Sequence, residues 1–499
     1  MYTRLLLVLG LALLPWSPSL AQQTDAYDYH GPTRMLIQRG TQALMMCNGL
    51  FVSNRTLDQV YEQELQYYRM PALPPYGGQV TIDEERQGVV VGGASNDAVP
   101  AMRAVARPGL GCIILPPDQT LADAEALPQL TLPPPPDASQ VPWPQGDLIP
   151  ETALPAEIDA EALAAASDWT FDRTTHGHPS QVTLSLIVVH RGQIVHERYA
   201  PGVDYTTRTR TWSTAKSIAA TLIGLQVDAG TLDLDAPLGF DWLPEAPHAE
   251  HDPRQAITLR HALHMASGLQ AIDNRGLCEV RGSCLSYWAG TSSVEGALRR
   301  ALVRTPGVHW DYENYDTLLA LYALKQALGS EQAYLEYPRR ALFDTVGMHH
   351  TIPGVDRFGD YVMSSQVYTN ARDLARFGLL YLQEGVWQGE RVLSQAWIDF
   401  VRTPAPASAR RGHDYGGQFW LPPDDRTDIP ADAYSTAGNR GQYVVIVPSQ
   451  DLVIVRRGLD WLPGIHRFSQ WDLTREVMKA FPERPWGEKR TIEDVAGDE

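Results

Sequence analysis

The first part of the chain carries a helical pattern followed by an extended one. Apolar side chains recur every three or four positions over residues 34–50 and 57–68, which predicts two amphipathic helices. The apolar run at 88–92 predicts a strand, and residues 101–115 close the segment. We therefore expect a small N-terminal accessory domain over residues 32–115, and we can assign no chemistry to it.

Proline separates this segment from the rest of the chain. Residues 116–155 contain four consecutive prolines at 133–136 and further ones at 142, 144, 150 and 155. Proline favours extended backbone without internal hydrogen bonds. The composition predicts a linker that runs over the surface of the next domain.

A second domain is expected over residues 156–485. Apolar, β-branched runs at 183–190 and 193–200 are split by Arg191-Gly192, which predicts a hairpin. A helical region follows over 213–400, then strand-like runs at 442–447 and 452–456, and a last amphipathic helix at 469–480. Strands at both ends with helices between them predict an α+β fold, in which one antiparallel sheet lies beside a helical lobe. The polar residues 486–499 predict a flexible tail.

The first 21 residues have the pattern of a signal peptide. Arg4 precedes an apolar run from Leu5 to Leu14, and small residues lead to a cleavage site after Ala21. The run is too short to span a bilayer comfortably, although an uncleaved anchor is the alternative. We expect a periplasmic or secreted protein with no membrane span after cleavage.

The net charge limits the classes of binding partner, and the cysteine content indicates disulfide bonds. The formal net charge of −18 disfavours binding to nucleic acid or anionic lipid. Export permits disulfides among Cys47, Cys112, Cys278 and Cys284. We expect the pairs 47–112 and 278–284, one of three possible connectivities. Four reduced thiols are the alternative.

The segment around Ser213 carries the most informative motif. Good helix formers follow from Thr214, so Ser213 is expected at a helix N-terminus, where free N–H groups and the helix dipole favour negative charge. Lys216 lies on the same helical face, and a buried lysine loses affinity for its proton. The pair predicts a serine nucleophile activated by an amine. The alternative is a serine that only caps the helix beside a solvated lysine.

Two later segments supply groups that suit such a site. Tyr312 offers a phenol that can relay protons, and the Asn314 amide can hold both a lysine and a substrate carbonyl. Tyr315 is a competing candidate for the phenol. A glycine-containing strand edge at 435–442 can offer a backbone N–H to a developing oxyanion. Taken singly, each segment also fits a core tyrosine, a turn asparagine or an ordinary hairpin.

The chain carries three sequence elements in order: Ser213 with Lys216, Tyr312 with Asn314, and the glycine-containing strand edge at 435–442. Together they resemble the motifs of the class C β-lactamase-like serine hydrolases. That superfamily includes class C β-lactamases, DD-peptidases, family VIII esterases and 6-aminohexanoate-dimer hydrolases. The segments at 228–238, 257–269, 342–348 and 369–378 are also similar to its turns and helices. The similarity covers residues 180–480 and implies a β-lactamase/transpeptidase-like fold, a five-stranded antiparallel sheet flanked by helices with an all-helical lobe.

The resemblance also implies roles for single residues. It makes Ser213 the nucleophile and Lys216 the base or proton relay, and it has Tyr312 protonate the leaving group and then activate water. Asn314 is implied to position the substrate. The implied oxyanion hole consists of the N–H groups of Ser213 and Asn439.

The third element departs from the β-lactamase pattern. Where those enzymes have Lys-Thr-Gly, this chain has Thr436-Ala437-Gly438, so the cation that would pair with a β-lactam carboxylate is missing unless Arg440 replaces it. The strand edge at Gly438 and the tryptophan before the nucleophile, Trp212, are closer to the 6-aminohexanoate-dimer hydrolase branch. Both join Asn314 and Asn439 as expected substrate-binding residues.

The sequence therefore predicts an exported serine hydrolase that cleaves a small-molecule ester or amide without a cofactor. A β-lactamase or DD-peptidase is one alternative, and a non-catalytic binding or sensing module on the same fold is another. We expect no metal site, because the histidines at 248, 251, 261 and 264 have no carboxylate at the usual spacing.

Overall fold

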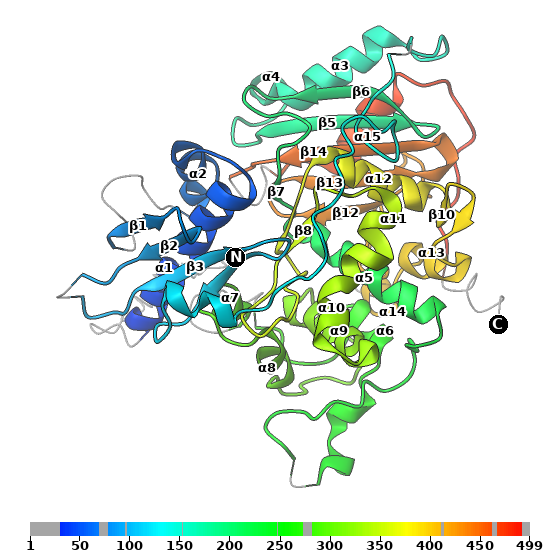
Figure 1. Cartoon of the computed structure of the whole chain (residues 1–499). Coiled ribbons are helices and arrows are strands. Elements are labelled where there is room, and N and C mark those ends of the chain that lie inside the picture. The colour runs from blue at the N-terminus through cyan, green and yellow to red at the C-terminus, as the bar shows by residue number, and fades with distance from the viewer. Residues whose placement is uncertain are drawn as a thin grey trace, which may run out of the picture.

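A five-stranded antiparallel sheet lies at the centre of the larger part of the chain (Figure 1). The computed structural model describes residues 30–68, 78–94, 97–151, 153–246, 248–272, 282–410, 414–461 and 467–491. The strand order is β12-β13-β14-β5-β6, with bounds β5 (Thr183–His190), β6 (Gln193–Tyr199), β12 (Tyr434–Gly438), β13 (Gln442–Val447) and β14 (Leu452–Gly458). Because β14 pairs with β5, early and late strands meet in one sheet, which confirms the predicted α+β fold.

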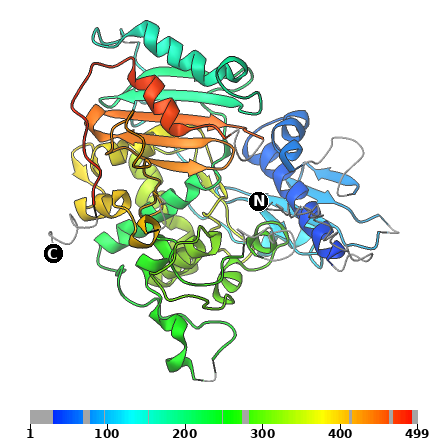
Figure 2. The ribbon, with the colours of Figure 1, turned by 180° about the vertical axis from the view of Figure 1, so that it is seen from behind.

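Alternate residues of the strands enter two separate cores. On one face Val188 packs with α3 (Ala160–Phe171) and α15 (Gln470–Met478), and Figure 2 shows α15 lying across the sheet. On the other face Val189 packs with α12 (Ala371–Leu382). Successive side chains of a strand point to opposite faces, so helices on both faces require the continuous apolar runs seen in the sequence.

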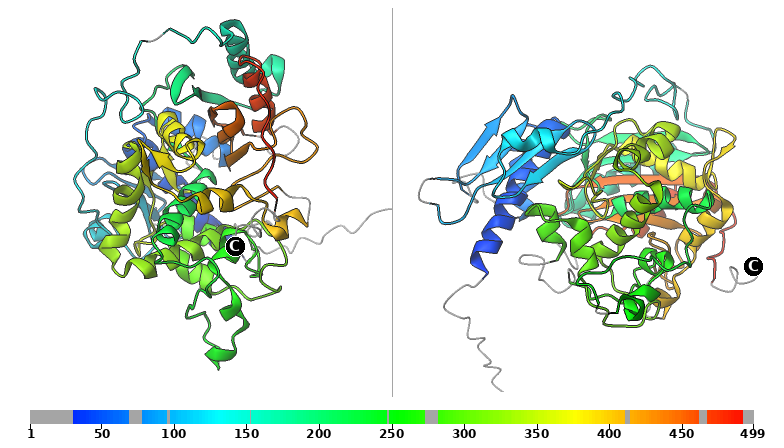
Figure 3. Two further views of the ribbon diagram at one scale, coloured as in Figure 1. Left: turned by 90° about the vertical axis from the view of Figure 1, so that its right-hand side faces the viewer. Right: turned by 60° about the horizontal axis from the view of Figure 1, so that its bottom comes forward.

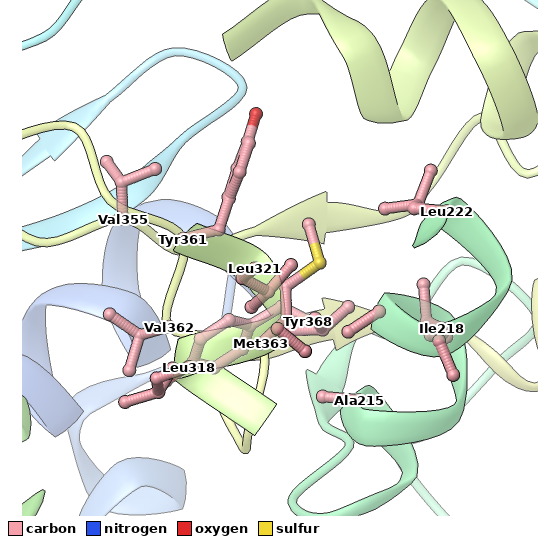
Figure 4. Packing of buried hydrophobic residues seen from close by; sticks show 14 of the residues in the cluster. Ala215, Ile218, Leu222, Leu318, Leu321, Val355, Tyr361, Val362, Met363 and Tyr368 are labelled. Atoms are coloured by element: carbon pink, nitrogen blue, oxygen red, sulfur yellow. The ribbon is translucent and has the colours of Figure 1, made fainter. Parts of the chain in front are cut away.

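The helical lobe lies beside the β12 edge of the sheet. Its helix α5 (Thr214–Asp228) is buried along most of its length, and Figure 4 shows Ala215, Ile218 and Leu222 in one cluster with Leu318 of α9 (Asn314–Leu328). The larger part of the chain, lobe and sheet together, contains further helices: α4 (Arg173–His176), α6 (Leu259–Leu263), α7 (Ser283–Trp288), α8 (Ser293–Leu298), α10 (Glu331–Pro338), α11 (Asp344–Val346), α13 (Gln395–Arg402) and α14 (Pro406–Ala409). Within the described ranges, every helix falls short of the length and apolar character that a membrane crossing requires.

Short strands lie just before and within the region 213–400 that was predicted as helical. A three-stranded sheet has the order β7-β9-β8, and a separate hairpin pairs β10 with β11. Their bounds are β7 (Thr209–Arg210), β8 (Ile352–Pro353), β9 (Val367–Thr369), β10 (Val386–Trp387) and β11 (Glu390–Arg391). Strands of two or three residues are too short to show a period of two in the sequence. Strand β7 matters for the site, because it leads directly into the segment that carries Ser213.

Residues 30–115, here called the N-terminal unit, form a four-stranded antiparallel sheet with helices packed on it (blue to cyan in Figure 1). Its helices are α1 (Gly31–Cys47), which continues as a π-helical turn (Asn48–Val52), α2 (Leu57–Gln63) and the 3-10 turn η2 (Leu65–Tyr68). Its strands are β1 (Val80–Asp83), β2 (Gly88–Val91), β3 (Met102–Arg107) and β4 (Gly111–Leu115). The sequence pattern missed β1 and extended the second helix to residue 68.

The N-terminal unit packs directly against the helical lobe. A Cβ atom added to Gly40 of α1 would lie 1.6 Å from the carbonyl oxygen of Trp288 at the end of α7, so only glycine permits this approach. Buried residues of α1, such as Met46, belong to the same apolar cluster as those of the lobe. The unit therefore shares a core with the rest of the molecule.

One of the two predicted disulfides is confirmed. Cys47 at the end of α1 is bonded to Cys112 of β4, which ties the two ends of the N-terminal unit together. Cys284 is also disulfide-bonded, and its predicted partner Cys278 lies outside the described residues. So does the predicted signal peptide, residues 1–21.

The proline-rich segment passes along the outside of the molecule toward α3 (Figure 3). It is held there by the buried Arg376 of α12, which donates to the carbonyl oxygen of Pro144 over 2.7 Å and pairs with Asp147 over 2.8 Å. At the other end of the chain, Lys489 of the predicted tail forms ion pairs with Asp414 and Asp424.

Candidate active site

Ser213 sits at the N-cap position of α5, and its hydroxyl makes no capping hydrogen bond. Other N-cap serines, such as Ser292 of α8 and Ser330 of α10, accept a bond from their own helix. Lys216, one turn further along α5, is only 1% exposed. The interpretation of a capping serine beside a solvated lysine is therefore wrong, and the hydroxyl is available for chemistry.

Three acceptors surround the buried amine of Lys216. Its Nζ donates to the Asn314 side-chain oxygen over 2.6 Å and to the carbonyl oxygen of Ser364 over 2.8 Å. It lies 3.5 Å from the hydroxyl oxygen of Ser213. The amide of Asn314 is itself oriented by donating to Ser283 Oγ over 3.2 Å. This arrangement holds the amine in place beside the hydroxyl, and a shortening of a few tenths of an ångström, about what substrate binding brings, would allow direct proton transfer.

Tyr312 lies on the other side of the same hydroxyl. Its phenol is hydrogen-bonded to Ser213, and the Lys216 amine is 5.1 Å from the centre of its ring. Burial raises the pKa of Tyr312 to about 12, although the bond to Ser213 and the positive charge of Arg467 act in the opposite direction. The phenol is therefore protonated at neutral pH and can act as a proton donor.

The competing phenol, Tyr315, points elsewhere. Its hydroxyl donates to the carbonyl oxygen of Gly282 over 2.9 Å and lies 3.2 Å from Ser286 Oγ, inside the helical lobe. Helix α9 begins at Asn314, so Tyr315 lies in its first turn, whereas Tyr312 remains on the extended segment before it. The choice that the sequence left open thus falls on Tyr312.

The end of β12 approaches the Ser213 segment very closely. A Cβ atom added to Gly438 would lie 2.2 Å from the carbonyl oxygen of Thr211 and 3.2 Å from the nitrogen of Thr214, so this contact requires glycine. The hydroxyl of Thr214 further donates to the carbonyl oxygen of Gln442 over 3.0 Å. These contacts bring the backbone after Gly438, including Asn439, next to the N-terminus of α5.

A cavity of about 360 Å³ opens between these elements. Its walls include Ser213 and Tyr312 from the lobe, and the ring of Trp420 is tilted against that of Tyr312 with 5.5 Å between ring centres. Asn439 contributes from the sheet side, and Tyr67 from the N-terminal unit. The arrangement suits acyl transfer, because a buried amine and a phenol flank a hydroxyl that faces a cavity.

The other predicted substrate-binding residues, Asn314, Gly438 and Trp212, contact residues of the site and are not among the cavity walls. Asn314 binds Lys216, and Gly438 packs on Thr211. The ring of Trp212 is stacked 6.3 Å from that of Tyr68, and its backbone has a φ of +51°.

Several known proteins are similar to this chain in sequence or structure. The 6-aminohexanoate-dimer hydrolase of Paenarthrobacter ureafaciens is 23% identical over 300 residues, which cover 55% of this chain and 72% of that protein. A class C β-lactamase structure is 15% identical, with a TM-score of 0.48, covering 67% of this chain and 100% of its own. A family VIII carboxylesterase structure is 14% identical, with a TM-score of 0.45, covering 65% and 98%.

The family model described as Beta-lactamase matches residues 171–456, more than half of the chain. The chain belongs to the β-lactamase family. The match begins at the end of α3 and ends in β14, so it contains the sheet, the lobe and the residues around Ser213. The N-terminal unit lies outside it.

Within this β-lactamase-family site, Arg440 does not replace the missing cation of the third element. Its guanidinium pairs with Glu64 over 3.2 Å and donates to the backbone carbonyl oxygens of Gln63, Leu459 and Asp460 over 2.7–3.0 Å. The side chains of Arg440 and Glu64 are each 3% exposed. Arg440 thus lines the cavity, but its guanidinium is engaged by partners within the protein.

Sequence reasoning missed several residues of the site. The carbonyl of Ser364 and the wall residues Tyr67 and Arg467 belong to no recognisable motif. A role played by a backbone carbonyl does not depend on the residue type, so it cannot be inferred from the sequence. Tyr67 is 146 positions before Ser213, in a segment outside the similarity to the serine hydrolases. Only the tertiary structure shows that it lies at the site.

Proposed function

We propose that this protein is an exported serine hydrolase that cleaves small esters or amides through an acyl-enzyme on Ser213. The observation that carries the proposal is the convergence of the Lys216 amine and the Tyr312 phenol on one hydroxyl at the wall of a cavity.

The proposed reaction has two halves. Lys216, as a neutral amine, accepts the proton of Ser213 as its oxygen attacks the substrate carbonyl carbon. The N–H groups of Ser213 and Asn439 stabilise the resulting oxyanion. The Tyr312 phenol donates its proton to the leaving alcohol or amine, which departs and leaves an ester on Ser213. Water then attacks that ester as the Tyr312 phenolate takes up its proton, and the Lys216 ammonium returns a proton to Ser213 as the acid is released.

Two features favour esters or open-chain amides over β-lactams. Thr436 occupies the position where β-lactamases carry a lysine, and Arg440 is engaged by Glu64. The relative from Paenarthrobacter ureafaciens is named for hydrolysing a 6-aminohexanoate dimer, which is an open-chain amide. A β-lactam carboxylate would therefore lack its usual lysine partner at the third element, Thr436-Ala437-Gly438 of β12.

Export to the periplasm or the medium is part of the proposal. The signal-like sequence at residues 1–21 and the bond between Cys47 and Cys112 support it, because disulfides persist in oxidising compartments.

Labelling and turnover test the proposal together. We expect a fluorophosphonate probe to label the protein, and p-nitrophenyl butyrate to be turned over faster than nitrocefin. Ser213→Ala should lose both labelling and turnover, whereas Ser330→Ala, which removes an exposed N-cap serine of α10, should keep both. Unchanged turnover in Ser213→Ala would refute the acyl-enzyme, and failure of the wild type on every ester would favour a binding module. Faster turnover of nitrocefin would make the protein a β-lactamase.

A further inference from the structure

Among the described residues of the N-terminal unit, one side chain lines the cavity. Tyr67, on the turn η2, lines the cavity together with Ser213 and Tyr312. The family match begins only at residue 171, so this wall comes from outside the part of the chain that belongs to the β-lactamase family.

Tyr67 contacts both segments that flank the reactive hydroxyl. Its phenol oxygen accepts a hydrogen bond from the Asn439 side-chain amide over 2.6 Å. Its ring packs edge-on against Trp212, the residue before Ser213, with 5.7 Å between ring centres. One side chain thus bridges the two segments whose backbone N–H groups are proposed to bind the oxyanion.

The position of Tyr67 is fixed by buried charge. Glu64, one turn earlier, lies between Arg55 at 3.0 Å and Arg440 at 3.2 Å, and all three side chains are at most 5% exposed. The guanidinium of Arg440 also lies over the Tyr67 ring, 4.7 Å from its centre. Charges are buried at a cost that is offset only by good pairing, so this junction has little freedom to move.

The same junction holds Trp212 in an unfavourable conformation. Its φ of +51° lies in the left-handed region, which is strained for a bulky side chain. The Tyr68 ring stacks on the indole from the N-terminal unit, and the Arg210 guanidinium lies 3.9 Å from its centre. Aromatic residues of the N-terminal unit therefore help to set the backbone just before the nucleophile.

We infer that Tyr67 is a positioning and specificity-determining residue of the active site, and that the N-terminal unit is an integral part of that site. The inference rests on the proposed function. The phenol fixes the Asn439 segment for oxyanion binding, and the ring limits the size of the substrate group that fits on this side of the cavity.

Two substitutions separate these roles. Tyr67→Phe keeps the ring and removes the hydroxyl, so kcat for p-nitrophenyl butyrate should fall by about 3- to 10-fold, the value of one hydrogen bond, while KM changes less than about twofold. Tyr67→Ala also removes the ring, so kcat/KM for p-nitrophenyl octanoate relative to the butyrate should rise about tenfold. Tyr61→Phe, on α2 of the same unit and away from the cavity walls, is the matched control and should resemble the wild type.

A double-mutant cycle tests whether Tyr67 acts through Asn439. If the hydroxyl works by holding that amide, Tyr67→Phe should have little further effect on kcat in an Asn439→Ala background. Additive effects, or a chain-length preference of Tyr67→Ala equal to that of the wild type, would overturn the inference. If Tyr67→Ala does not fold, Tyr67→Leu provides the same test of size.

The outcome is distinguishable from failure of the proposed function. A wild type that neither reacts with a fluorophosphonate nor hydrolyses any ester disproves the hydrolase itself. A wild type that does both, together with Tyr67 variants that match it in kcat, KM and chain-length preference, disproves only the role of Tyr67.

Discussion

The amine of Lys216 donates to the side-chain oxygen of Asn314 across 2.6 Å, a shorter distance than those to the Ser364 carbonyl and the Ser213 hydroxyl. A neutral amide holds the amine without stabilising its protonated form as a carboxylate would. This difference matters because the proposed reaction needs Lys216 to accept a proton.

Asn314→Asp should therefore slow turnover at neutral pH and move the acidic limb of the pH–rate profile upward. A carboxylate beside the amine favours the ammonium form, and an opposite charge at this distance shifts such equilibria by about 1–3 pH units. Asn54→Asp makes the same change at an exposed position and should leave the profile unmoved. An Asn314→Asp profile that coincides with the wild type would show that Lys216 is not the base.

Tyr312→Phe should lower kcat by about 10²–10⁴-fold, the usual contribution of a positioned acid–base group. The loss should be larger with an alkyl ester than with a p-nitrophenyl ester, because p-nitrophenolate leaves without needing a proton. Tyr315→Phe removes the neighbouring phenol, which is bonded to Gly282 inside the lobe, and should reduce thermal stability with little change in kcat. Equal kinetic losses in the two variants would remove Tyr312 from the mechanism.

Much of the fold and the centre of the site could be predicted because their signals are local. Ser213 and Lys216 are one helical turn apart, so their proximity follows from helix geometry alone. The long runs of β5, β13 and β14 are buried on both faces and give strong strand signals, whereas β7 to β11 are too short to do so.

The rest of the site depends on contacts between distant segments. The choice between Tyr312 and Tyr315 turns on where α9 begins, and the sequence does not fix that residue. The bond between Tyr67 and Asn439 joins positions 372 residues apart. No periodicity or motif reports such a pairing, and the match of Glu64 to Arg440 is likewise a product of the packed structure.

Glu64→Ala should lower the free energy of unfolding by about 3–5 kcal/mol, because it leaves Arg55 and Arg440 buried without their shared carboxylate. The effect should appear as a lower midpoint in thermal unfolding followed by circular dichroism. Glu62→Ala removes an exposed carboxylate from the same helix and should change the midpoint little. Similar midpoints for the two variants would mean that the buried ion pairs do not anchor the N-terminal unit.

Asp147 should make the attachment of the proline-rich segment sensitive to acid. Burial would raise the pKa of its carboxyl, but hydrogen bonds from His350 and Arg376, each at 2.8 Å, lower that pKa to about 2. A carboxyl whose pKa is lower in the folded state stabilises the fold above its unfolded pKa of 3.8, and this contribution disappears as the pH falls toward 2.

Asp147→Asn should therefore destabilise the protein by about 2 kcal/mol at pH 7, and the difference from the wild type should shrink between pH 4 and pH 2. Thermal unfolding midpoints measured across that range give the comparison. Asp118→Asn, at an exposed position of the same segment, should run parallel to the wild type at every pH. A constant gap between Asp147→Asn and the wild type down to pH 2 would contradict the ion pair, because a protonated Asp147 and an asparagine present Arg376 with similar neutral acceptors.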